Sequence, residues 1–251
     1  GAMNSQAVLW RFKQTRIGRC LKSIRDEARQ LSRRVRRRVR SEREYRSRIA
    51  AVARRGSGYL VESYDAIYKS DPTRWTVDHD TCDQFVLNLL RPLAGKRLLD
   101  VGCGNGLTLA AAARLGARTY GADFSAEGLA LAKKNSPETE FVEADGCRLS
   151  FASGDFDLVL NVGSLEHYLD PALGVREMRR VVKPDGRVLI LVPDFSLREK
   201  QLGVQEYELM WSQRKWAGVI ERNGLRIQRR EMFVDSSDPT NRCFVFVCNP
   251  N

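Results

Sequence analysis

The stretch LLDVGCGNGLTLAAA, residues 98–112, joins a short apolar run to a glycine-rich turn and then to a run of helix formers. The apolar run predicts a buried strand, and the alanine-rich run predicts a helix. A strand, a glycine turn and a helix N-terminus together present backbone N–H groups to a ligand. The glycines at 102, 104 and 106 are spaced G-x-G-x-G, which differs from the G-x-G-x-x-G of dinucleotide-binding proteins. The glycines alone are also compatible with a tight structural turn.

On both sides of this stretch, short apolar runs alternate with helical patterns. The strand candidates are residues 97–101, 118–123, 140–145, 156–161 and 187–193. The helix candidates between them are residues 107–116, 125–135 and 171–182. This alternation predicts an α/β fold, a Rossmann-like doubly wound sheet that is mostly parallel. Two further strand-like runs, separated by the turn-forming DSSDPTN, predict an antiparallel C-terminal hairpin.

The composition is that of a globular protein, with 43% hydrophobic and 29% charged residues among 251. No apolar run approaches the roughly 18 residues of a membrane span. Six cysteines without a C-x-x-C pair and only two histidines argue against a zinc site or a disulfide framework. We therefore expect no metal and a reduced, cytoplasmic protein. Gly1 and Ala2 are typical of a scar left by a cleaved tag.

The positive charge is concentrated in one segment. Residues 11–55 hold 18 Lys and Arg against 4 Asp and Glu, so the net charge of +11 divides into +14 there and −3 elsewhere. An apolar stripe at helical spacing runs from Ile17 to Val35, which predicts a basic amphipathic helix. We expect residues 1–55 to be an extension and 56–251 to be the α/β domain. The extension could be a solvated arm, bind an anionic membrane surface from the cytoplasmic side, or bind nucleic acid.

The glycine-rich stretch resembles motif I of the class I S-adenosylmethionine-dependent methyltransferases, in which an acidic residue precedes V-G-x-G-x-G. Four later segments resemble the same family in order and spacing: YGADFS, EADG, FDLVLNVGSLEH and MRRVVKPDGRVLILVPD. The resemblance covers about residues 60–250, in the small-molecule branch of the family. It implies a seven-stranded methyltransferase fold, S-adenosylmethionine as the cofactor and S-adenosylhomocysteine as its product.

The resemblance also assigns residues to the cofactor. It implies that Asp123 accepts hydrogen bonds from both ribose hydroxyls and that Asp145 contacts the adenine amino group, although either alone could be a strand-end cap. Tyr64 and Tyr68 resemble an aromatic lid over the cofactor, with plain helix packing as the alternative. The predicted cofactor-binding residues are Tyr64, Asp100, Gly102, Cys103, Gly104, Asn105, Gly106, Asp123, Phe124, Ser125, Asp145, Gly146, Asn161, Val162 and Gly163.

Two residues are candidates for catalysis. His167 follows the fourth predicted strand and Asp194 follows the fifth, where open parallel sheets bind ligands. Resemblance to sugar O-methyltransferases implies that His167 deprotonates a hydroxyl and that Asp194 assists. A histidine suits this role because its ordinary pKa, about 6.5, is close to the working pH. Alternatively, His167 packs at a helix start and Asp194 caps a helix.

These observations predict an enzyme that methylates a hydroxyl of a sugar, a lipid-linked glycan or a natural product by base-assisted in-line displacement. No N-P-P-Y and no Pro-Cys follows the fourth strand, which disfavours methylation of exocyclic adenine or glutamine nitrogens and of RNA cytosine C5. One alternative is an enzyme that acts on RNA or another macromolecule recruited by the basic extension. A second is a scaffold that binds the cofactor without catalysis.

Overall fold

A computed structural model describes residues 47, 50–56, 58–71, 79–196 and 207–251. The chain divides into two compact units, Gly1–Ala51 and Val52–Asn251, and the strands of the sheet all belong to the second. The predicted basic helix lies almost wholly outside the described residues. In the described part of the chain, no helix is both long and apolar enough to cross a bilayer.

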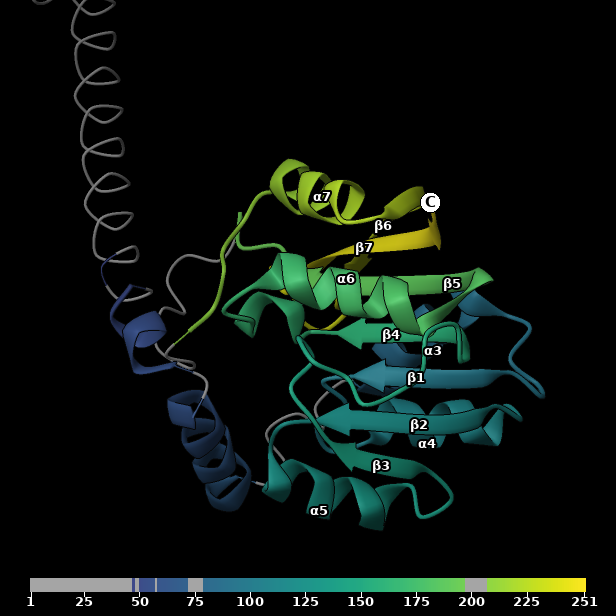
Figure 1. Cartoon of the computed structure of the whole chain (residues 1–251), viewed down its shortest axis with the longest axis horizontal. Helices are drawn as coiled ribbons and strands as arrows, with labels where there is room; N and C mark the ends of the chain where they lie inside the picture. The colour runs from purple at the N-terminus through teal and green to yellow at the C-terminus, as the bar shows by residue number, and fades with distance from the viewer. Residues whose placement is uncertain (1–46, 48–49, 57, 72–78, 197–206) are drawn as a thin grey trace, which may run out of the picture. The chain divides into compact units, whose positions relative to one another are not determined.

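The second unit is built on one seven-stranded sheet with the order β3-β2-β1-β4-β5-β7-β6, as Figure 1 shows. Strands β1 to β5 are parallel, and β7 pairs antiparallel with both β5 and β6. The predicted fold, mostly parallel with an antiparallel C-terminal hairpin, is therefore confirmed. The strands are β1 Arg97–Val101, β2 Arg118–Asp123, β3 Glu140–Glu143, β4 Phe156–Val162, β5 Val182–Pro193, β6 Leu225–Val234 and β7 Arg242–Pro250.

The order of the strands follows from their side chains. Strands β4, β5 and β7 carry the buried apolar runs Leu158 to Leu160, Val188 to Val192 and Phe244 to Cys248. Such runs are typical of strands covered on both faces. Strand β6 instead exposes Arg226, Arg229 and Arg230, and charged side chains of this kind protect the edge of a sheet. Strand β7 therefore lies inside the sheet and β6 at its edge.

Helices cover both faces of the sheet. In Figure 1, α6 and α7 lie in front of it and α3 and α4 behind it. Side-chain oxygens cap three of the helices: Ser125 caps α5, Asp170 caps α6 and Ser212 caps α7. A further helical stretch covers residues 58–70. The helices are α3 His79–Leu90, α4 Leu107–Arg114, α5 Ala126–Asn135, the single turn η1 Leu165–His167, α6 Pro171–Val181 and α7 Gln213–Arg222.

The topology determines where a ligand can bind. Strand β1 pairs with β2 on one side and with β4 on the other, so the chain leaves the centre of the sheet in opposite directions. Loops after the two central strands therefore diverge and leave a crevice at their carboxyl ends. The glycine-rich turn follows β1, Asp123 ends β2 and His167 follows β4, all at this edge.

Candidate functional site

The turn after β1 requires glycine for conformation and for space. Gly102, Gly104 and Gly106 have φ angles of 79°, 51° and 75°, a region that L side chains adopt only with strain. A Cβ at Gly102 would lie 2.2 Å from Ser164 Oγ, and one at Gly104 would lie 2.6 Å from the Tyr68 hydroxyl. The turn therefore keeps its backbone close to the loop after β4 and to the 58–70 helix.

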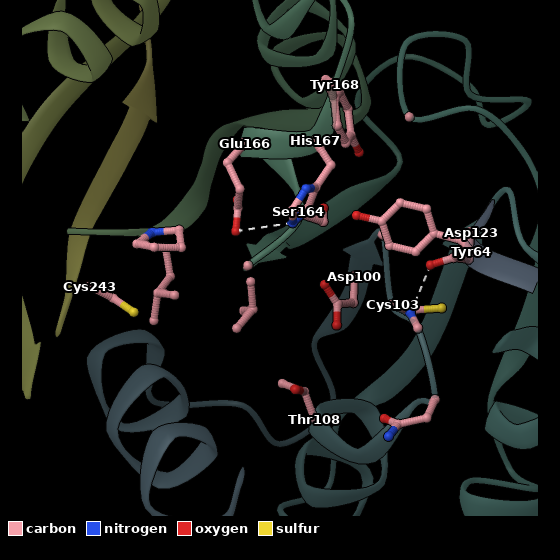
Figure 2. Close-up of a pocket in the computed structure, with 18 of the residues that line it drawn as sticks. Tyr64, Asp100, Cys103, Thr108, Asp123, Ser164, Glu166, His167, Tyr168 and Cys243 are labelled. Carbon is pink, nitrogen blue, oxygen red and sulfur yellow. Dashed lines mark hydrogen bonds and ion pairs between the residues drawn. The ribbon is translucent and has the colours of Figure 1, made fainter. Parts of the chain in front are cut away.

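Beside this turn lies a cavity of about 340 Å³, shown in Figure 2. Its floor is the glycine turn, and its walls come from the 58–70 helix, the loops after β2 and β4, and the ends of β5, β6 and β7. The residues that line it include Tyr64, Tyr68, Asp100, Gly102, Cys103, Gly104, Asn105, Asp123, Phe124, Gly146, Val162, Gly163, Glu166, His167, Leu191, Pro193, Glu208, Phe233, Asp235, Asn241 and Cys243. Most of the residues predicted to bind the cofactor thus border one cavity.

Asp123 ties the loop after β2 to the glycine turn. One of its carboxylate oxygens accepts a hydrogen bond from the Gly104 N–H and the other from the Ser125 N–H, each at 2.8 Å. Burial raises the pKa of Asp123, and the hydrogen bonds from Ser125, Gly104 and Phe124 oppose that rise. The carboxylate is therefore oriented by the backbone at the position where the resemblance places the ribose.

Asp100 and Asn105 leave polar atoms without partners. Asp100 Oδ1 and Asn105 Nδ2 are buried and, within the described residues, make no hydrogen bond. Burial, and then the charges of Asp83 and Asp123, raise the pKa of Asp100 to about 7. A ligand with an ammonium donor and a carboxylate acceptor would satisfy both atoms. The amino-acid end of S-adenosylmethionine has these groups and therefore fits this part of the cavity.

A second hollow of about 320 Å³ continues from the first past Phe124, Gly146 and Tyr168 to Asp145 and Leu60. A Cβ at Gly146 would lie 2.0 Å from the Tyr168 hydroxyl, so a larger residue there would collide with Tyr168. The Asp145 carboxylate accepts a hydrogen bond from the Cys147 N–H at 2.8 Å. Asp145 thus borders this second hollow and not the first cavity, and its contact with the adenine amino group stays a prediction.

The 58–70 helix covers the cavity with aromatic side chains. The Tyr64 ring meets Phe124 edge-on at 5.4 Å and His167 at 5.6 Å between centroids. Burial raises the pKa of Tyr64 well above its ordinary value, so its hydroxyl stays protonated. Tyr64 therefore lies between Phe124, in the loop after β2, and the predicted catalytic histidine.

His167 is held with one ring nitrogen turned toward the cavity. It is 8% exposed, and its Nδ1 lies 2.7 Å from the Tyr207 carbonyl oxygen. Because a carbonyl only accepts, Nδ1 carries the hydrogen and Nε2 keeps its lone pair. Burial lowers the pKa of His167 to about 4, against a smaller rise from the Tyr207 hydrogen bond. The imidazole is therefore neutral near pH 7, and Nε2 lies 3.6 Å from Glu166 Oε1.

Asp194, the other predicted catalytic residue, has different neighbours. One of its oxygens accepts a hydrogen bond from the Ser196 N–H at 2.9 Å, and the other lies 3.3 Å from the Arg242 guanidinium. It is 3% exposed and is not among the described residues that line the cavity. The structure thus places Asp194 behind the cavity wall, where it links the end of β5 to β7.

Three residues predicted to bind the cofactor support the site from outside the cavity lining. Asn161 donates to the Val101 carbonyl at 2.8 Å and accepts from the Leu165 N–H at 2.9 Å. Ser125 caps α5, and a Cβ at Gly106 would lie 2.9 Å from that of Ala132. These residues hold the loops around the cavity in place.

The structure also brings in residues that the sequence did not single out, chiefly Glu166, Glu208, Asp235, Asn241 and Cys243. Glu166 precedes His167, so the E-H pair was a local signal for it. Glu208 has no such signal, because it enters through a segment 40 residues further on. There the Tyr207 carbonyl accepts from His167, and the Leu209 N–H donates to the Glu166 carbonyl at 2.7 Å.

Comparisons with known proteins give the family and the fold. A methyltransferase-domain family model matches residues 99–190. A ubiquinone biosynthesis O-methyltransferase from Brucella ovis is 34% identical over 180 residues, which cover 68% of this chain and 71% of that protein. The fold is similar to that of a SAM-dependent methyltransferase from Aquifex aeolicus, with a TM-score of 0.58, 19% identity, and coverage of 78% of this chain and 99% of that one.

A geranyl diphosphate C-methyltransferase from Streptomyces coelicolor, solved with Mg²⁺, geranyl diphosphate and S-adenosylhomocysteine, also shares the fold. Its TM-score is 0.58 at 15% identity, with 68% of this chain and 77% of that chain covered. The Brucella relative carries the assignment, since its identity and coverage extend well beyond the glycine-rich motif. The chain therefore belongs to the class I S-adenosylmethionine-dependent methyltransferases, as the sequence predicted, and S-adenosylmethionine is its cofactor.

Proposed function

We propose that this enzyme transfers the methyl group to a hydroxyl oxygen of a small-molecule acceptor. The observation that carries the proposal is the position of His167 Nε2, a neutral imidazole nitrogen that faces the cavity beside Tyr64. A hydroxyl is a poor nucleophile until it loses its proton, and a neutral imidazole within reach can accept that proton. The name of the Brucella relative, an O-methyltransferase, supports oxygen as the methylated atom.

The shape of the cavity supports a small acceptor. Its walls include Leu191, Pro193, Phe233 and Cys243. Figure 2 shows Cys243 and the Tyr64 ring on opposite sides of the site. Apolar and aromatic walls bind a flat or partly apolar molecule by excluding water from it. We therefore infer an aromatic or partly apolar alcohol or phenol as the acceptor, within the broader class of hydroxylated natural products and glycans.

Different residues serve the cofactor and the acceptor during the transfer. Bound S-adenosylmethionine supplies a methyl group on a sulfonium, whose leaving group is neutral. Asp123 and Asp100 hold the cofactor, so the acceptor has to approach from the opposite end of the cavity. His167 Nε2 takes the hydroxyl proton while the oxygen forms its bond to the methyl carbon. Asp194 assists indirectly, because its ion pair with Arg242 fixes the cavity wall.

The basic extension lies almost wholly outside the described residues. Its binding to a membrane surface or to nucleic acid, and the cytoplasmic location of the enzyme, stay predictions. Catalysis separates the proposal from the alternative of a cofactor-binding scaffold, since a scaffold would bind S-adenosylhomocysteine and form no product.

The test is a product assay with the purified 251-residue chain and methyl-labelled S-adenosylmethionine. The acceptor panel would pair phenols and catechols with the matching anilines and thiophenols, and would include simple glycosides. We expect label on oxygen, detected as a methyl ether by mass spectrometry, and a loss of that product in His167→Gln. Methylation confined to nitrogen or sulfur, or no binding of S-adenosylhomocysteine in calorimetry, would overturn the proposal.

A further inference from the structure

We propose that Glu166, His167 and Glu208 form a binding site for one divalent transition-metal cation at the acceptor end of the cavity. One ligand atom from each residue, an imidazole nitrogen and two carboxylate oxygens, lies within 4.8 Å of the other two. Ligands of such a cation lie about 2.0–2.2 Å from it. Side-chain rotations that move each ligand atom by about 1 Å would therefore let all three atoms bind one cation. The proposal rests on the proposed function only in what it says about the acceptor.

The orientation of His167 points to a ligand independently of the two carboxylates. Its Nδ1 donates to the Tyr207 carbonyl, so the lone pair is on Nε2. That nitrogen makes no hydrogen bond within the described residues. The side chain is only 8% exposed, so water does not readily replace the missing partner. Glu166 Oε1 lies 3.6 Å from Nε2, and Figure 2 shows both groups turned toward each other. Metal-binding histidines commonly donate their other nitrogen to a carbonyl in this way.

The backbone fixes Glu208 next to the E-H pair. Tyr207, on one side of it, accepts through its carbonyl from the His167 ring, and Leu209, on the other side, donates its N–H to the Glu166 carbonyl at 2.7 Å. Two hydrogen bonds therefore flank Glu208 and tie its segment to η1. Such a preorganised arrangement lowers the cost of collecting three ligands from segments 40 residues apart.

The ligand set indicates the class of cation. Imidazole suits zinc, iron, copper and nickel, and carboxylates suit manganese, magnesium and calcium. A mixture of one imidazole and two carboxylates fits Mn²⁺, Fe²⁺ or Zn²⁺. Three protein ligands leave at least one coordination position open, and all three residues line the cavity. The sequence predicted no metal because the spacing of Cys and His residues does not reveal a set that is assembled from distant segments.

An open position next to the methyl-transfer site would bind an oxygen of the acceptor. Coordination lowers the pKa of a hydroxyl, so a bound cation can take over the activation that His167 provides in the metal-free protein. A cation and a proton compete for the same Nε2 lone pair. Methyl transfer to oxygen is compatible with either state, and only the group that activates the hydroxyl differs.

Mn²⁺ itself is the probe, because the free ion has a strong paramagnetic resonance signal that is lost on binding. The 251-residue chain, freed of metal by chelation, would be titrated with MnCl₂ in the absence of cofactor and acceptor. We expect one Mn²⁺ per chain, and an affinity weakened by at least about tenfold in Glu208→Gln and in Glu166→Gln. Asp235→Asn alters a carboxylate in the same cavity outside the cluster and should bind Mn²⁺ like the wild type.

Circular dichroism melts of each variant show whether it is folded, and Glu208→Gln is the main variant because Glu208 is only half-buried. Absence of saturable binding, or equal affinity in wild type and both glutamine variants, would overturn the site. The product assay separates the two proposals. Oxygen methylation by protein that binds no Mn²⁺ refutes the metal site alone. Specific Mn²⁺ binding without any methylated oxygen supports the site and refutes the proposed function.

Discussion

The Asp65 carboxylate accepts a hydrogen bond from the Ser125 hydroxyl at 2.5 Å, although the two residues are 60 positions apart. Ser125 is also the N-cap of α5, and its own N–H is bound by Asp123. The 58–70 helix is therefore fastened to the loop that we expect to hold the ribose. A substitution that removes this hydrogen bond should therefore affect cofactor binding.

Removing the link should weaken cofactor binding. In Asp65→Ala, the 58–70 helix loses a hydrogen bond to a charged group, so Tyr64 and Tyr68 are no longer held over the cavity. We expect the dissociation constant of S-adenosylhomocysteine, measured by calorimetry, to rise about tenfold. Lys69→Ala is the control, because the ion pair of Lys69 with Glu127 is exposed and contributes little. Equal affinities in the two variants would show that the link is not needed.

A methyl group at Gly104 should disrupt the site in two separable ways. Gly104→Ala strains a backbone with a φ of 51° and places a Cβ 2.6 Å from the Tyr68 hydroxyl. We expect cofactor affinity to fall about a hundredfold. Adding Tyr68→Phe removes the collision but not the strain, so it should restore part of the loss.

Gly154→Ala is the matched control for that experiment. Gly154 has a φ of 68°, but a Cβ added there would have nothing within 4 Å. This variant should lose about 1 kcal/mol of stability and keep its cofactor affinity. A loss of affinity as large as that of Gly104→Ala would mean that general destabilisation, and not the site, explains both results.

Asp100 should make the free enzyme less stable as the pH rises. Its pKa is about 7 in the folded protein, raised by burial, and about 3.9 in the unfolded chain. Between these values the folded state binds more protons, so the free energy of unfolding falls from pH 4 to pH 7 and then levels off. Asp100→Asn removes this dependence and should be more stable at pH 7, by up to about 4 kcal/mol.

Urea denaturation of wild type and Asp100→Asn at intervals from pH 5 to pH 8 measures this difference. The gap between the two proteins should widen with pH up to about 7. A gap that stays constant across the series would mean that Asp100 does not titrate in this range. The same variant should bind S-adenosylmethionine more weakly, because it has lost the negative charge opposite the ammonium group.

His167 and Asp194 should differ in kinetics. His167→Gln removes the proton acceptor and should lower kcat about a hundredfold with little change in cofactor affinity. Asp194→Asn weakens the ion pair with Arg242, so it should lower the melting temperature and reduce kcat by less than about tenfold. An equal collapse of kcat in both folded variants would place Asp194 in the chemistry itself.

The cation site predicts that chelation changes activity in a residue-dependent manner. If Mn²⁺ activates the acceptor, treatment with a chelator should reduce turnover of the wild type and leave Glu208→Gln at its already lower rate. Asp235→Asn should respond to chelation as the wild type does. Initial rates measured with and without added MnCl₂ test this, and a wild type insensitive to chelation would show that the cation is not used in catalysis.

The sequence was sufficient for features determined by local patterns. Apolar runs and glycines predicted the strands, the glycine turn and the positions of Asp123 and His167, because parallel strands bring their carboxyl ends to one edge. Local patterns do not show how a loop turns after its strand ends. Asp194 was expected at the cavity but is behind its wall, paired with Arg242 from β7. Glu208 was missed because its segment has no helical or strand-like hydrophobic periodicity that would indicate its position next to the E-H pair.

The place of β7 between β5 and β6 has a consequence for synthesis of the chain. About 50 residues separate the end of β5 from the start of β7, and β6 cannot join the sheet until β7 is present. Translation adds about 5–20 residues per second, so the apolar edge of β5 stays unpaired for several seconds before β7 has been synthesised. An unpaired apolar edge invites aggregation, so a nascent chain that stalls between residues 193 and 242 is the form most in need of a chaperone.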